Sequence, residues 1–159
     1  MLHLLLAAMT LTSPDLANGV PVPRAFVWNR DGCDGANRTP RLHWNSPPRG
    51  TRAFALTVVD HDAPKPGGWV HWLVFDIPAS ARALDGSQPR GALAGRNDFG
   101  TTGWGGPCPP PGPQHHFLVE LDALDVAPRF GPQTSLAAYR AQVRGHVLRA
   151  ARIVPVYRR

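Results

Sequence analysis

Frequent proline and glycine residues limit the length of any helix or strand in this chain. Proline (18) and glycine (16) make up more than a fifth of the 159 residues and are spread along the whole sequence. Because proline interrupts helices and central strands and glycine favours turns, these residues divide the chain into short apolar runs. Such runs are typical of β-rich proteins, so the sequence favours a mainly β fold, and its length fits one domain with its own core.

Two apolar runs flank a polar turn and define the centre of the predicted fold. Residues 53–59 and 69–77 are rich in β-branched and aromatic side chains, which predicts two buried strands. The turn residues at 63–68 predict that these strands pair as a hairpin with a long tip. Regular alternation along the second strand would place one ionisable side chain among apolar ones on a single face: Trp69, His71, Leu73, Phe75 and Ile77.

The second half of the sequence contains a rigid loop, another strand and helical segments. Residues 103–113 include five prolines and four glycines, which predicts a stiff, irregular loop suited to the wall of a binding site. Residues 115–124 predict a strand, with His115 and Phe117 on its apolar face. Residues 136–142 and 146–151 favour two short helices by propensity, and a closing strand is expected within 153–157.

The charge distribution indicates which partners the chain suits. The net charge is +6, and Lys65 is the only lysine among the 17 basic residues. The arginines are scattered, and neither a basic stripe nor an aromatic stacking motif is present, so nucleic acid is not a predicted partner. The positive balance instead suits small anions or acidic protein surfaces.

The first residues leave the compartment open between two interpretations. Residues 1–10 are either a misplaced start, with Met9 as the true initiator, or a weak signal segment without a basic beginning. The apolar run is too short to span a bilayer, and residues 11–159 are expected to form the domain. A misplaced start implies a cytoplasmic protein, which is our prediction, whereas a signal segment implies a periplasmic one.

Four polar residues in or beside the predicted strands are candidates for chemistry: Asp60, Asp62, His71 and His115. They can stabilise a turn and a core, ligate a metal, act as an acid/base pair, or bind the oxygens of an anion. Neither a G-x-S-x-G elbow nor a C-x-x-C motif is present. From the residues alone, Cys33 and Cys108 are either one disulfide or two buried thiols.

Five motifs, taken in order, resemble the phosphatidylethanolamine-binding protein family, and its bacterial Raf kinase inhibitor-like branch in particular. They are Asp60-His61-Asp62-Ala63-Pro64, Gly67-Gly68-Trp69-Val70-His71-Trp72, Asn97-Asp98-Phe99-Gly100, Gly106-Pro107-Cys108-Pro109-Pro110-Pro111-Gly112, and His115. The resemblance implies a large antiparallel sheet packed on a smaller sheet, with one or two short C-terminal helices. It also implies that Cys33 and Cys108 lie close enough to bridge.

The resemblance further implies a small pocket for phosphate, phosphorylated headgroups or similar anions. Asp60, His71 and His115 would line it, Asp62 would support it, and Gly106 and Pro110 would shape its rim. Two departures from the family pattern affect this expectation. His61 replaces a proline, and His115-His116-Phe117 replaces a His-Arg-Tyr sequence. Phe117 lacks the phenolic hydroxyl, and the loss of one buried hydrogen bond costs about 1 to 3 kcal/mol, so phosphate affinity should be weaker or the ligand different.

These observations predict a non-enzymatic binding protein without catalytic residues, metal or cofactor. It would sense a small anion or phosphorylated ligand, or inhibit a partner such as a kinase or protease. One rival is a hydrolase or metal-assisted enzyme that uses Asp60, His71 and His115. The other is a protein interaction module with a vestigial pocket, whose arginine-rich surface binds the partner.

Overall fold

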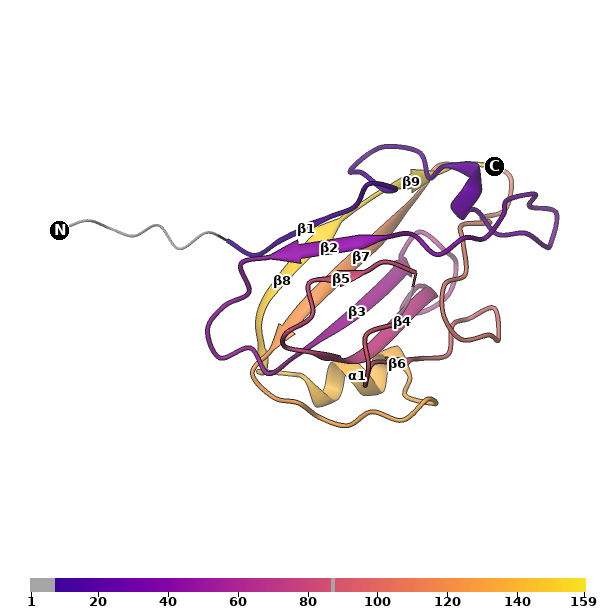
Figure 1. The fold of residues 1–159 in the computed structure, drawn as a ribbon. Coiled ribbons are helices and arrows are strands. Elements are labelled where there is room, and N and C mark those ends of the chain that lie inside the picture. The colour runs from indigo at the N-terminus through magenta and orange to yellow at the C-terminus, as the bar shows by residue number, and fades with distance from the viewer. Residues whose placement is uncertain (1–7, 87) are drawn as a thin grey trace.

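The computed structural model describes residues 8–86 and 88–159, and its largest element is a six-stranded antiparallel sheet (Figure 1). Residues 1–7, which hold most of the predicted start or signal segment, lie outside the described residues. Along the chain the elements are β1 (Thr10–Thr12), the short 3-10 helix η1 (Arg24–Phe26), β2 (Leu42–Asn45), β3 (Ala53–Asp60), β4 (Trp69–Pro78), β5 (Ala83–Leu84), β6 (Leu93–Ala94), β7 (His115–Leu124), α1 (Leu136–Gln142), β8 (Val147–Ile153) and β9 (Val156–Tyr157).

The strands form two sheets of different size. The large sheet has the order β6-β4-β3-β7-β8, with β9 also paired to β7, and the small sheet has the order β1-β2-β5. Strands β3 and β4 pair antiparallel across the turn at residues 61–68, which confirms the predicted hairpin. The mainly β fold, with a large antiparallel sheet, a smaller one and a C-terminal helix, is likewise confirmed.

Apolar side chains cover both faces of the large sheet. One cluster joins the sheets, where Trp44 of β2 contacts Phe54 of β3 with ring centroids 5.5 Å apart. The other cluster lies beneath α1, where Tyr139 contacts Phe75 of β4 at 5.2 Å. Burial of such side chains contributes roughly 25 cal/mol per Å² of apolar surface, so the central strands are held from both sides.

Only one of the two predicted C-terminal helices forms among the described residues. The Ser135 hydroxyl oxygen caps α1 by accepting a hydrogen bond from Ala138 N at 3.1 Å, and Leu136 and Tyr139 are buried against the sheet. The prediction of a second helix at residues 146–151 was wrong, because residues 147–151 belong to β8, which pairs with β7. Backbone pairing with a distant strand outweighed the local helix propensity.

Two β-bulges break the regular alternation predicted along β4. His71 is the extra residue between the pairs Val58↔Trp72 and Val59↔Val70, and a second irregularity follows Val74. Consequently Leu73 and Phe75 pack in the cluster under α1, whereas Ile77 packs in the cluster between the sheets. The prediction that all five side chains share one face was therefore wrong. A bulge redirects the side chain of its extra residue, and here that residue is His71.

A buried acid links the helix to the large sheet. The Tyr139 hydroxyl donates a hydrogen bond to Asp122 Oδ2 at 2.6 Å, and both residues are buried. Burial raises the pKa of Asp122 to about 6, although the hydrogen bond from Tyr139 opposes this effect. Asp122 therefore retains its proton in the folded protein at pH values where the unfolded chain has lost it.

We expect Asp122→Asn to stabilise the protein increasingly as pH rises. Because the folded pKa is the higher one, the contribution of wild-type Asp122 is complete below pH 3.8 and is lost as pH rises through about 6. Asparagine still accepts from Tyr139 and never ionises. In urea unfolding experiments, the free energy of unfolding of the variant should therefore rise relative to that of wild type by about 1 to 3 kcal/mol between pH 4 and pH 8. Asp34→Asn, at an exposed ion pair with Arg24, is the control. If the difference in unfolding free energy between Asp122→Asn and wild type stays constant or narrows as pH rises, the raised pKa of Asp122 is contradicted.

Candidate ligand-binding site

A cavity of about 310 Å³ lies where β3 ends and where β4 and β7 begin. Four residues expected at the site from the sequence line it, namely Asp60, His71, Pro110 and His115. The remaining wall residues are Ala63, Pro64, Lys65, Trp69, Phe99, Cys108 and Pro109. Apolar groups thus form most of the wall, with a few polar groups among them, as is common in small-molecule sites.

Asp60 and His115 form a buried pair at the cavity. His115 Nδ1 donates to Asp60 Oδ2 at 2.7 Å, and both side chains are more than nine-tenths buried. The other carboxylate oxygen, Oδ1, accepts from the backbone N–H groups of Asp62 at 2.9 Å and Ala63 at 3.2 Å. These bonds fix the imidazole orientation and leave His115 Nε2 as the ring nitrogen available to a ligand.

The β-bulge at His71 connects the cavity to the loop that precedes the prolines. His71 Nδ1 donates to Gly105 O at 2.6 Å, and Gly105 N donates to His71 O at 2.8 Å. Burial lowers the pKa of His71 to about 4, although the bond to Gly105 and the nearby Asp60 charge oppose this effect. His71 is therefore neutral near pH 7, with Nε2 as a hydrogen-bond acceptor.

The Asn97 side chain shapes the loop that brings Phe99 to the cavity. Its Oδ1 accepts from Phe99 N and Thr101 N, both at 3.1 Å, and its Nδ2 donates to Gly103 O at 3.0 Å. In this position Phe99 meets the rings of Trp69 and His71 edge to face, with centroids 5.5 and 5.4 Å away. Buried polar groups thus order an irregular loop and place an aromatic ring.

Among the residues that the structure describes, only Lys65 brings a permanent positive charge to the cavity wall. Its ammonium group forms an ion pair with Asp98, which also accepts from Val70 N at 2.7 Å. Lys65 Nζ lies 5.7 Å from the centre of the Trp69 ring. The lysine is therefore held at the rim by a carboxylate and an aromatic face.

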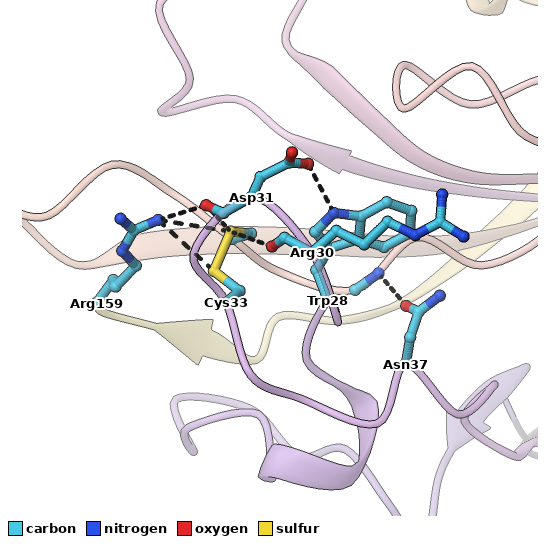
Figure 2. Close-up of a disulfide and its surroundings, with 8 residues drawn as sticks. Trp28, Arg30, Asp31, Cys33, Asn37 and Arg159 are labelled. Atoms are coloured by element: carbon cyan, nitrogen blue, oxygen red, sulfur yellow. Dashed lines mark hydrogen bonds between the residues drawn. A yellow bond between two sulfur atoms is a disulfide. The ribbon is translucent and has the colours of Figure 1, made fainter.

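A disulfide fixes the proline-rich wall. It joins Cys33, in the loop after η1, to Cys108, and their Cα atoms are 6.0 Å apart. Figure 2 shows Arg159 beside this bond, with its Nη1 3.7 Å from both sulfur atoms and 3.3 Å from Asp31 O. Because Cys108, Pro109 and Pro110 all line the cavity, the bond connects this wall to a distant part of the chain.

Three residues expected at the pocket from the sequence lie outside its wall. Asp62 is exposed and accepts from His116 N at 2.8 Å and from His116 Nδ1 at 2.9 Å, so it connects the hairpin turn to β7. Gly106 is not among the lining residues, and its backbone N donates to Asn37 Oδ1 at 2.8 Å. Phe117 is buried against His71, with ring centroids 5.1 Å apart.

Sequence reasoning did not identify Lys65, Trp69 or Phe99 as site residues. The sequence analysis places Trp69 on an apolar face and within the motif at residues 67–72, and Lys65 in a turn, without a ligand-binding role for either. The one signal for Phe99 was its position in the Asn97-Asp98-Phe99-Gly100 motif. The His61 side chain, at the position of the first departure, is exposed and is not among the residues that line the cavity.

The geometry also bears on the rival chemistries. Within residues 8–86 and 88–159, no three His, Cys, Asp or Glu side chains gather in a way that could hold a metal ion. Cys108 is bonded to Cys33, so the cysteine on the cavity wall is not a free nucleophile in this state. Of the helices that the structure describes, none has the length and apolarity needed to cross a membrane.

Comparisons with known proteins place these features in a family. Residues 12–158 match the family described as Phosphatidylethanolamine-binding protein. Together with the fold, the match shows that the chain belongs to the phosphatidylethanolamine-binding protein family, as the sequence motifs predicted.

Bacterial proteins are among the relatives. The UPF0098 protein YbcL of Escherichia coli is 38% identical over 161 residues, covering 95% of this chain and 88% of YbcL. The crystal structure of YbcL, described as a new member of the mammalian PEBP family, superposes with a TM-score of 0.90 at 37% identity, covering 96% of this chain and 99% of that one. A putative homologue from Chlamydia trachomatis gives 0.83 at 29% identity, covering 96% and 98%.

Proposed function

We propose that this protein is a binding protein whose cavity accepts a small ligand carrying an anionic group, such as a phosphorylated headgroup. The observation that carries the proposal is the Asp60–His115 pair on the wall of an otherwise largely apolar cavity. His115 Nε2 would donate to the anionic group when the ring is protonated. The aromatic rings of Trp69 and Phe99 would contact the remainder of the ligand.

A carboxylate beside a bound anion is acceptable only if its charge is compensated. Asp60 accepts two backbone hydrogen bonds in addition to the one from His115 Nδ1, and these three donors offset the charge of the carboxylate. Lys65 adds a positive charge at the rim. The Trp69 Nε1–H group is buried and has no acceptor among the described residues, so a ligand oxygen reaching it would satisfy this donor.

The test is a calorimetric titration with phosphoethanolamine and with inorganic phosphate. We expect saturable binding, and His115→Ala should weaken it by about tenfold or more, because a hydrogen bond to a charged group contributes about 1.5 to 3 kcal/mol. His116→Ala is the matched control, since this neighbouring histidine is exposed and bonds to Asp62 outside the cavity. Absence of saturable heat from wild type, or equal losses in the two variants, would contradict the proposal.

The same titration tests the protonation state of His71 on the cavity wall. Burial lowers the pKa of His71 to about 4, so its ring is neutral at pH 6 and at pH 8 and its charge does not change between these values. The ratio of the affinities measured at pH 6 and pH 8 should therefore be the same in His71→Ala as in wild type. A ratio that differs between the two proteins would contradict the lowered pKa of His71.

We further propose that the protein works in an oxidising compartment. The support is the Cys33–Cys108 disulfide, since such bonds persist mainly outside the reducing cytosol. One relative, 41% identical over 126 residues, is described as the putative lipoprotein LppC of Mycobacterium tuberculosis. The disulfide thus favours the periplasmic alternative over the cytoplasmic prediction. Acid quenching of cells followed by thiol alkylation should find both cysteines blocked from alkylation, and two alkylated cysteines would contradict this proposal.

A further inference from the structure

A second, larger cavity is lined by both residues of the Lys65–Asp98 ion pair. It has a volume of about 530 Å³ and is bounded by the turn before β4, the loop at residues 96–100 and the first part of α1. Within residues 8–86 and 88–159, Lys65 alone lines both this cavity and the one beside His115. The two cavities are therefore neighbours with different walls.

The second cavity has unbalanced positive charge. Asp98 is the one acidic residue among the described residues that line it, and its carboxylate accepts hydrogen bonds from Lys65 and from Val70 N. Arg96 and Arg140 also line the cavity and are exposed, and neither forms an ion pair with a carboxylate among the described residues. The charges of Lys65 and Asp98 cancel, so the guanidinium groups of Arg96 and Arg140 remain to attract an anion.

The floor of the same cavity is apolar. Val70 and Leu73 of β4 and Leu136 of α1 line it, and all three belong to the core cluster beneath the helix. An apolar floor beside unpaired arginines fits neither a free inorganic ion nor a neutral hydrocarbon well. It fits a molecule that carries an acidic group on an apolar body.

We propose that this second cavity is a binding site for small amphipathic organic anions. Arg96 and Arg140 bind the acidic group, and Val70, Leu73 and Leu136 contact the apolar part. The volume is within the range of sites for small molecules. Binding here does not require the Asp60–His115 pair, so the site is independent of the proposed function of the first cavity.

The test uses anilinonaphthalene sulfonate as the probe, titrated calorimetrically against the full chain. Arg96→Gln and Arg140→Gln should each weaken binding by about tenfold, because each removes a charged hydrogen bond. Arg144→Gln is the matched control, since Arg144 is an exposed arginine just beyond α1 that lines a different cavity. Ala137→Trp, at an exposed helical position on the cavity wall, should block the site without disturbing the core.

The outcomes separate the two cavities. Retained affinity in His115→Ala, together with the losses in the arginine and Ala137 variants, would support the second site. Loss in His115→Ala alone would place the probe in the first cavity and overturn the proposal. Equal weakening by Arg144→Gln would indicate a nonspecific charge effect, and absence of saturable binding would also overturn it.

Discussion

Replacing both Cys33 and Cys108 with serine is expected to lower the free energy of unfolding by about 4 kcal/mol. The disulfide closes a loop with a sequence separation of 75, and in the chain-entropy account such a bond restricts the unfolded state more strongly as the loop lengthens. Urea unfolding of the double-serine variant, compared with oxidised wild type, measures this change. Reduced wild type should match the variant, and a difference below about 1 kcal/mol would contradict the expectation.

The same pair of substitutions should also affect binding at the first cavity. Cys108 lines the cavity and is bonded to Cys33, so the disulfide holds the proline-rich wall in place. A wall that is ordered before binding reduces the entropy lost on association. We therefore expect weaker affinity for phosphoethanolamine in the folded double-serine variant at a temperature well below its unfolding transition.

Substitution of alanine for Gly106 is expected to destabilise the fold by about 3 kcal/mol or more. A Cβ atom at this position would lie 2.2 Å from Phe26 O and 2.5 Å from Trp28 N, and both are backbone atoms. The opposing segment has little freedom to move, because Phe26 O accepts from Trp104 Nε1 at 2.9 Å and Trp28 N donates to Pro107 O at 3.2 Å.

Thermal unfolding provides the measurement for Gly106→Ala, with Gly131→Ala as the matched control. A Cβ at Gly131 would meet no atom within 4 Å, so the control should unfold close to wild type. A Gly106→Ala protein that unfolds within about a degree of wild type would show that the two segments separate easily, contrary to their hydrogen bonds. The absence of a Cβ atom at Gly106 thus allows its segment to pack closely against the backbone of Phe26 and Trp28.

Local sequence patterns were most informative where they extended over a long segment. The apolar runs on both sides of the Asp60–Asp62 turn predicted β3, β4 and their pairing, and alternation from His115 onward predicted β7 with its buried face. The same reasoning failed at residues 146–151, where β8 depends on pairing with β7. It also failed along β4, because a bulge depends on the register of the partner strand.

The candidate site likewise contains some residues that the sequence motifs predicted and others that only tertiary contacts bring to the cavity. Asp60, His71, Pro110 and His115 were placed at the pocket through their motifs, and the structure brings all four to one cavity. Lys65 and Phe99 reach the same wall through an ion pair with Asp98 and through the Asn97 hydrogen bonds. The neutral state of His71 was likewise invisible in the sequence, because it results from burial.

The sequence by itself determined the strand-rich character of this protein, its main hairpin and its family, since these depend on local periodicity, turn residues and motif order. Only the tertiary structure decided which side chains form the cavity walls, how the Asp60–His115 pair is oriented, and where two arginines face an apolar floor. The physical reason is that these features arise from contacts between residues distant in sequence. Their geometry and electrostatics exist only once the sheets, loops and helix have packed together.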